Sequence, residues 1–149
     1  MINDDLKLRG DVAIVLKDKY GNVKDSREIH NLVVSAGLTF ICSRMAGTSA
    51  GVMSHMALGS GTTAASASQT DLVSILGSRE ALDSTSASSN TITYVSSFEA
   101  GEGTGAVTEA GIFNASSSGT MLCRTVFPVV NKQADDTMSV TWTITLTAS

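Results

Sequence analysis

The sequence has little charge, few cysteines and no long hydrophobic run, and each scarcity excludes a class of protein. Charged residues make up 16% of the 149 residues, below the usual share of about 25%. The net charge is −4 and no basic patch is visible, which argues against a nucleic-acid partner. No stretch approaches the roughly 18 apolar residues of a membrane span. The start, Met-Ile-Asn-Asp-Asp, is not typical of a signal peptide, so we expect folding in a reducing cytoplasm.

Cysteine and proline are equally scarce: the chain has only Cys42, Cys123 and Pro128. Two cysteines this far apart form no metal-binding pattern. Free cysteines are usually buried, so we expect two buried thiols, and a single disulfide between them is the alternative. Ser, Thr, Gly and Ala replace the missing charge, and such a polar, uncharged surface suits packing against other protein. The length fits one domain, 1–149, with a sizeable core.

Strand patterns dominate the chain. Apolar and polar residues alternate over Leu6–Leu16, which predicts a half-buried strand. The charged segment Val23–Ile29 is expected to be its return strand at a sheet edge, where charge discourages stray pairing. Further strands are predicted at Val52–Leu58, at Val140–Leu146 with Trp142 in the core, and as a hairpin of Ala81–Thr85 with Thr91–Phe98.

One segment changes to a helical period. Its apolar stripe, which we expect to face the core, consists of Val34, Leu38, Ile41 and Met45. Ser35 is the expected N-cap and Gly47 the expected stop, and Asp71–Leu76 is predicted to form one helical turn. Short strands at regular turn signals predict a mainly β fold, an antiparallel, jelly-roll-like β-sandwich with one α-helix packed on it.

The chain is organised around a predicted hairpin, Val107–Phe127. Two β-prone apolar runs flank the turn cluster Asn114–Gly119, and Phe113 is expected in the core. Glu109 and Arg124 are expected to pair across the two strands at a solvated position. Such a pair is worth less than about 1 kcal/mol and sets register more than stability.

Candidate chemical sites are few, and we interpret each as structural. Gly47–Gly51 matches the G-x-S-x-G elbow, but its predicted order of helix, loop and strand is the reverse of the order that the elbow requires. Gly101–Gly105 lacks the Lys-Ser/Thr of a phosphate loop. His30 and His55 lie on different elements without further ligands at metal-binding spacing. The acidic residues are interpreted as solvated turns: Glu99, Glu102, Glu109, Asp135 and Asp136. We therefore predict no catalytic, cofactor-binding or metal residue.

Several motifs occur in a recognisable order after the predicted helix. They are Met-Ala-Leu-Gly-Ser-Gly-Thr-Thr-Ala at 56–64, Leu-Gly-Ser-Arg-Glu at 76–80, Gly-Glu-Gly-Thr-Gly at 101–105, Glu-Ala-Gly-Ile-Phe-Asn at 109–114 and Gly-Thr-Met-Leu-Cys-Arg at 119–124, before a Thr-Trp-Thr-Ile-Thr-Leu ending. This order resembles small virion proteins of tailed bacteriophages, and also the N-terminal attachment domains of phage tail-collar and tail-fibre proteins. The resemblance covers about residues 32 to 147, and its motifs are structural.

The resemblance implies a non-enzymatic virion component that assembles in the host cytoplasm and binds other virion proteins as a homo-oligomer, a trimer or a dimer. Tail fibres continue from such a domain into a stalk, whereas this sequence stops at Ser149. That difference favours a capsid decoration (cement) protein that docks on the major capsid protein. The alternatives are a tail, collar, fibre or adaptor component and, more distantly, a carbohydrate-binding β-sandwich, for which the candidate aromatics are Trp142, Tyr20 and Tyr94.

We predict that Ser49 is not a nucleophile. A working serine needs a base within about 3 Å, held by a third group. His55 is the nearest histidine, and a strand would carry it away at about 3.3 Å per residue. A serine-directed fluorophosphonate probe should leave the folded protein unlabelled. Stoichiometric labelling that disappears in Ser49→Ala would reveal a hydrolase site.

Overall fold

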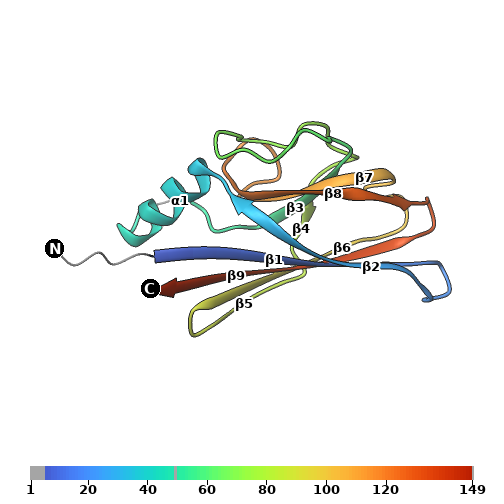
Figure 1. The fold of residues 1–149 in the computed structure, drawn as a ribbon, viewed down its shortest axis with the longest axis horizontal. Helices are drawn as coiled ribbons and strands as arrows, with labels where there is room; N and C mark the ends of the chain where they lie inside the picture. The colour runs from blue at the N-terminus through green and yellow to red at the C-terminus, as the bar shows by residue number, and fades with distance from the viewer. Residues whose placement is uncertain (1–5, 49, 149) are drawn as a thin grey trace.

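The strands form one antiparallel sheet that curls into two facing layers (Figure 1). The structure is a computed structural model that describes residues 6–48 and 50–148. Within these residues the strands and the helix are β1 Leu6–Lys17, β2 Val23–Val33, α1 Ser35–Met45, β3 His55–Gly59, β4 Glu80–Ala81, β5 Ser84–Ser88, β6 Thr91–Phe98, β7 Gly105–Phe113, β8 Met121–Lys132 and β9 Thr137–Ala148. The expected mainly β, antiparallel fold with one helix is confirmed.

The strand order is β4-β3-β7-β8-β2-β1-β9-β6-β5, and β2 links the two layers. It pairs with β1 from Val23 to Asn31, but it meets β8 only at Leu32 and Val33. Gly10 faces Asn31 in this register, and a Cβ atom at Gly10 would collide with the Asn31 side chain. The charged segment Val23–Ile29 therefore pairs with β1 alone and forms a free edge, as expected, whereas the end of its strand lies inside the sheet.

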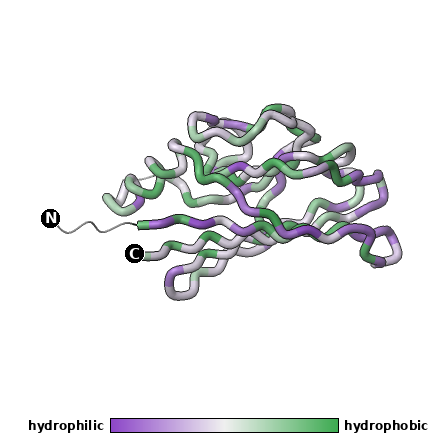
Figure 2. Tube along the Cα trace, in the orientation of Figure 1, coloured by the Kyte–Doolittle hydropathy of each residue, from purple (hydrophilic) through white to green (hydrophobic). Residues whose placement is uncertain are grey.

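The main core fills the space between the layers. β1 and β9 run side by side over their whole length, from Leu6 opposite Ala148 to Lys17 opposite Thr137. Both strands direct alternate apolar residues inward, including Val12, Ile14 and Trp142, all of them buried. Figure 2 shows hydrophobic residues recurring in both layers, whereas the turn between β1 and β2 is largely hydrophilic. The predicted strands at both ends of the sequence are confirmed.

The helix differs from its sequence expectation. Only Gly37 of α1 is buried, and a Cβ atom there would collide with the Leu122 carbonyl oxygen of β8. The helix thus approaches the sheet most closely at its glycine, and Phe40 and Ile41 pack against the main core as partly buried side chains. The stripe prediction holds for Val34, which is buried, and for Ile41, but it is wrong for Leu38 and Met45, which are exposed. Gly47 does end the helix, with a φ of +74°, as C′ glycines do.

Other local expectations need correction. Ser35 is the first helical residue and not the N-cap, which is Val34 without a side-chain cap bond. Residues 71–76 form no helical turn, because their polar groups bond to the sheet instead. The hairpin before β6 begins at Ser84, since Glu80–Ala81 pairs with β3 as a separate strand.

Both cysteines are free thiols, and no disulfide joins them. Cys123 is buried as expected, and burial raises the pKa of its thiol well above the ordinary value. Cys42 is exposed on α1, so the burial prediction is wrong for that residue. The described part of the chain contains no helix with the length and hydrophobicity that crossing a bilayer requires.

We predict that Phe113→Ala costs about 3–5 kcal/mol of unfolding free energy, because the truncation leaves a cavity in a packed core. The Phe113 side chain has 0% exposure, and the Arg79 guanidinium lies 3.6 Å from its ring centroid. Chemical denaturation measures the loss. Val23→Ala is the control, since Val23 is 59% exposed and surface truncations usually change stability by less than about 0.5 kcal/mol. A loss below about 1 kcal/mol in Phe113→Ala would contradict its packing role.

Candidate functional site

A long surface loop, residues 60–79, joins β3 to the strand β4 and lies over the outer face of β7 and β8 (Figure 1). The loop is rich in Gly, Ser, Thr and Ala and has no helix or strand of its own beyond a single bridge between Ile75 and Gly59. Leu72 and Leu76 are the loop residues that pack on the apolar clusters of the sheet. With so little apolar surface to bury, the shape of the loop depends largely on polar contacts to the sheet.

The central contact is a buried ion pair between β7 and β8. Arg124 Nη2 lies 3.2 Å from Glu109 Oε2, and both side chains have 0% exposure. The two residues are offset in the register, since Arg124 stands opposite Gly111 and Glu109 stands opposite Val126. The predicted pairing is confirmed, but the predicted solvated position is wrong. A buried pair of this kind requires further hydrogen bonds to offset its desolvation.

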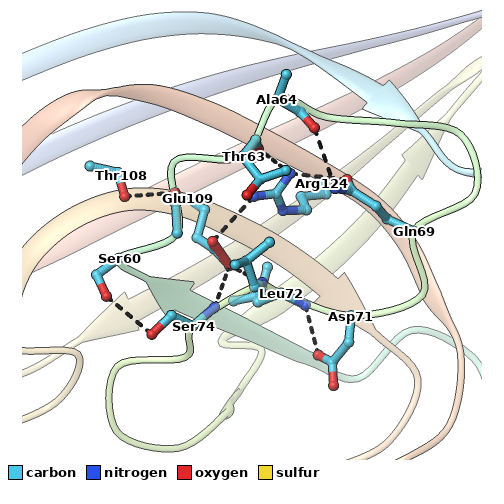
Figure 3. A network of polar contacts seen from close by, with 12 residues as sticks. Ser60, Thr63, Ala64, Gln69, Asp71, Leu72, Ser74, Thr108, Glu109 and Arg124 are labelled. Carbon is cyan, nitrogen blue, oxygen red and sulfur yellow. Dashed lines mark hydrogen bonds and ion pairs between the residues drawn. The ribbon is translucent and has the colours of Figure 1, made fainter.

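The surface loop supplies those hydrogen bonds, as Figure 3 shows. The amide of Val73 donates to Glu109 Oε1 at 2.7 Å. On the other side, Arg124 Nη1 donates to the Thr63 carbonyl at 2.9 Å and to Gln69 Oε1 at 3.0 Å. Both charges are thus bonded to the loop as well as to each other. We call Glu109, Arg124 and these loop partners the polar clamp.

The clamp needs glycine at two positions. A Cβ atom at Gly61 would collide with the Glu109 carboxylate, and one at Gly59 would lie 2.6 Å from the Ser74 carbonyl oxygen. Gly111 also lies close beneath the loop, since a Cβ atom there would be 3.0 Å from Leu72 Cδ2. These glycines allow the backbone of the loop to approach the sheet closely.

A second anchor fixes the end of the loop. Arg79 is 7% exposed at its side chain and lies over the Phe113 ring. Its Nη1 donates to the carbonyls of Ala115 and Ser118 in the β7–β8 turn, at 3.0 and 2.7 Å. Asn114 closes that turn by accepting from the Thr120 amide at 2.6 Å. A small apolar cluster also lies under the loop. It consists of Val34, Ala57, Phe113 and Met121, and Ala36 and Leu72 pack against it.

These residues come from the motifs that carry the resemblance. The 56–64 segment supplies Gly59, Gly61 and Thr63, the 76–80 segment supplies Arg79, and the hairpin supplies Glu109 and Arg124. Four of the motifs therefore contribute to fixing the surface loop, whereas the clamp residues Gln69 and Val73 lie outside them. Sequence reasoning missed the role of Arg79, for which the only signal was its place in a motif.

A second feature is an apolar groove at the end of the molecule where α1 lies. Its volume is about 420 Å³, and its lining includes Phe40, Ile41, Met45, Val52, Ile144 and Leu146. Tyr94 also lines it, and burial raises the pKa of that phenol to about 12. Met45 is 83% exposed. The C-terminal half of the helix contributes to the groove, through Phe40, Ile41 and Met45.

The two histidines that were considered as candidate chemical sites lie on different strands, His30 on β2 and His55 on β3. Ser49 lies outside the described residues. His55 Nδ1 is 2.7 Å from the hydroxyl of its neighbour Ser54, and His30 lies on β2, where its Nδ1 is 2.7 Å from Asp11 Oδ1. Within residues 6–48 and 50–148 no group of three or more His, Cys, Asp or Glu side chains is placed to hold a metal ion. The absence of catalysis and of metal binding stays a prediction.

The acidic residues correct one expectation. Glu109 is buried in the clamp, and Asp136 is buried beside Lys24, whose Nζ lies 2.7 Å from its Oδ2. That hydrogen bond is the main reason that the pKa of Asp136 is lowered. Glu102 does form a turn, since its Oε2 accepts from the Glu99 amide at 2.8 Å. Glu109 and Asp136, which were expected in solvated turns, are therefore buried and paired with a cation.

Comparisons of this chain with protein-family models, with curated proteins and with solved structures found no match.

We predict that Arg124→Met costs about 3–5 kcal/mol of unfolding free energy, because it leaves the Glu109 carboxylate buried without its cation. The surface loop should also become sensitive to thermolysin at Leu72 and Val73. Denaturation and limited proteolysis measure the two effects. The matched control is Arg9→Met, because the Arg9–Asp11 pair is exposed, with side-chain exposures of 66% and 40%, and should contribute less than about 1 kcal/mol.

Equal losses in the two variants would show that the clamp does not hold the loop. A double variant with leucine at both Glu109 and Arg124 should recover part of the stability, since no unpaired charge then remains. The same variant should stay sensitive to thermolysin, because the hydrogen bonds to the loop are still missing.

Proposed function

We propose that this chain is a non-catalytic structural component of a tailed-phage virion, and that it acts as a capsid decoration protein on the major capsid protein. The observation that carries the proposal is that residues from four of the phage-like motifs fix the surface loop, through the polar clamp, its glycines and Arg79. A protein whose motif residues hold a surface in one shape is suited to docking.

The fixed loop offers a docking surface. Val73 and Ile75 are 52% and 45% exposed on it, although their neighbours in the loop are bonded to the sheet. Apolar side chains on a rigid loop can enter a partner's pocket with little loss of conformational entropy. Burial of such a surface at capsid subunit junctions would stabilise the particle by mass action.

Two other functions remain as alternatives. A tail, collar, fibre or adaptor protein would use the same loop against a different partner. A carbohydrate-binding β-sandwich is less favoured, because Trp142 and Tyr94 are buried and only Tyr20 of the three candidate aromatics is exposed. A closed homo-oligomer, a dimer or a trimer, is the expected arrangement.

The number of copies in purified virions tests the proposal. A decoration protein on a symmetric capsid should be present in on the order of hundreds of copies per particle, and a collar component in about a dozen or fewer. Quantitative mass spectrometry of washed particles gives this number. A low copy number would support the tail alternative, and absence from washed particles would contradict both virion functions.

A loop variant tests the docking surface separately. Val73→Asp with Ile75→Asp should abolish binding to undecorated capsids, because two charges would be buried at the interface. Val23→Asp is the control, since Val23 is exposed at the far end of β2. Full capsid binding by the loop variant would place the contact elsewhere on the surface.

A further inference from the structure

We propose that the free edge of β5 pairs with β5 of a second copy of this chain, so that two molecules share one continuous sheet. Such a dimer specifies the homo-oligomer expected above, and it does not depend on the capsid role. Three features of β5 carry the inference: its open main-chain groups, its lack of charge, and the antiparallel register that its own sequence allows.

β5 is open on one side. It is the last strand in the sheet order, at the margin of one layer (Figure 1), and it pairs with β6 alone. In residues 6–48 and 50–148 no backbone hydrogen bond from another element reaches Ser84–Ser88. All of its side chains are exposed. The strand therefore presents unpaired main-chain donors and acceptors to its surroundings.

The residues that offer these groups can be identified. The Thr91 hydroxyl donates to the Ser88 carbonyl at 2.9 Å, so that carbonyl points toward β6. Along a paired strand the main-chain groups point alternately to one side and to the other. Ser86 therefore directs its groups toward β6 as Ser88 does, while Thr85 and Ala87 direct theirs to the free side.

The other open edges of the described sheet are protected, and β5 is not. β4 at the opposite end has only two residues. The open part of β8 contains Pro128, and Arg27 donates to the carbonyls of Pro128 and Val129 at 2.7 and 3.2 Å. The open part of β2 is charged, with Lys24, Asp25, Arg27 and Glu28. Such devices keep an edge from pairing with another chain, and Ser84–Ser88 has neither charge nor proline.

The sequence of β5 suits pairing with itself. Ser-Thr-Ser-Ala-Ser reads almost the same in both directions, so an antiparallel pair can form about a two-fold axis at Ser86. Thr85 of one copy then faces Ala87 of the other, and the two residues exchange their free hydrogen bonds. Asp83, the nearest charged residue, faces the uncharged Ser89 of the partner subunit and not a second carboxylate.

The two-fold axis also limits the assembly. Each copy contributes the same strand to the contact, and the contact uses the open edge of both copies. The assembly therefore closes at two molecules and does not grow into a fibre. This closure favours a second copy over an unrelated extended segment, which would leave the self-complementary register unused.

Light scattering after size-exclusion chromatography tests the dimer. The unmodified protein should have twice the mass of one chain. Ser86→Lys should halve that mass, because two positive charges would stand directly opposite each other at the axis. The matched control is Ser26→Lys, since Ser26 is an exposed serine on the charged edge of β2, and this variant should stay dimeric. Thermal unfolding should show that both variants are folded.

A charge exchange tests the register. Ser86→Glu alone should also have the mass of one chain. An equimolar mixture of Ser86→Glu and Ser86→Lys should recover the mass of two chains, because opposite charges then meet at the axis. A mixture that stays monomeric would show that position 86 does not face its own counterpart, and it would overturn the proposal.

Disulfide trapping tests the contact without adding charge. In the register proposed, the two copies of position 86 form a non-hydrogen-bonded pair, in which side chains lie closest. Ser86→Cys with Cys42→Ser should therefore give a disulfide-linked dimer under mild oxidation. Cys123 is buried and its thiol pKa is raised, so it does not compete. Ser26→Cys in the same background should give none.

Two results would overturn the proposal. One is an unmodified protein with the mass of a single chain at every concentration. The other is an oligomer that persists in Ser86→Lys and gives no crosslink through position 86, because its contact would then lie elsewhere. Neither result bears on the capsid role, which the copy number in virions tests separately.

Discussion

The ion pair between Glu109 and Arg124 is the interaction on which the surface of this protein depends. Both side chains are completely buried, and the desolvation of two charges costs more than one ion pair returns unless their other polar atoms are also bonded. Here the partners come from the surface loop, through the Val73 amide and the Thr63 carbonyl. The pair and the loop therefore stabilise each other, and neither keeps its position without the other.

Close packing between loop and sheet follows from the same constraint. Gly59 and Gly61 leave space for the Glu109 carboxylate, and Arg79 closes the far end of the loop over the Phe113 ring. A loop of small polar residues thereby becomes a fixed surface with a defined pair of apolar side chains. In the decoration function that we propose, this surface forms the contact with the capsid.

The fold was predictable wherever one face of an element is buried. Alternation in β1 and β9 sets which residues face the core, and the turn chemistry of Asn114 sets the central hairpin. The helix shows the limit, because its apolar period predicts burial of Leu38 and Met45, which are exposed, while the closest approach to the sheet is at Gly37. Periodicity identifies a helix, but it does not show which face the neighbouring strand approaches.

The site was predictable only in part. The pairing of Glu109 with Arg124 followed from their places in the hairpin, but their burial did not, because it is caused by a loop distant in sequence. The loop itself showed no periodic pattern from which its course could be deduced. Its carbonyls and amides bond to charged side chains, and such contacts leave no trace in local sequence beyond the glycines that permit them.

Hydrogen exchange at the Val73 amide tests the central claim most directly, because that amide donates to Glu109 Oε1 inside the clamp. If the buried pair holds the loop, this amide should exchange only through an opening almost as costly as global unfolding. The protection should disappear in Glu109→Gln, while the amides of the β1–β9 ladder stay protected. Exchange of the Val73 amide in the unmodified protein at the rate of an unstructured peptide would contradict the account.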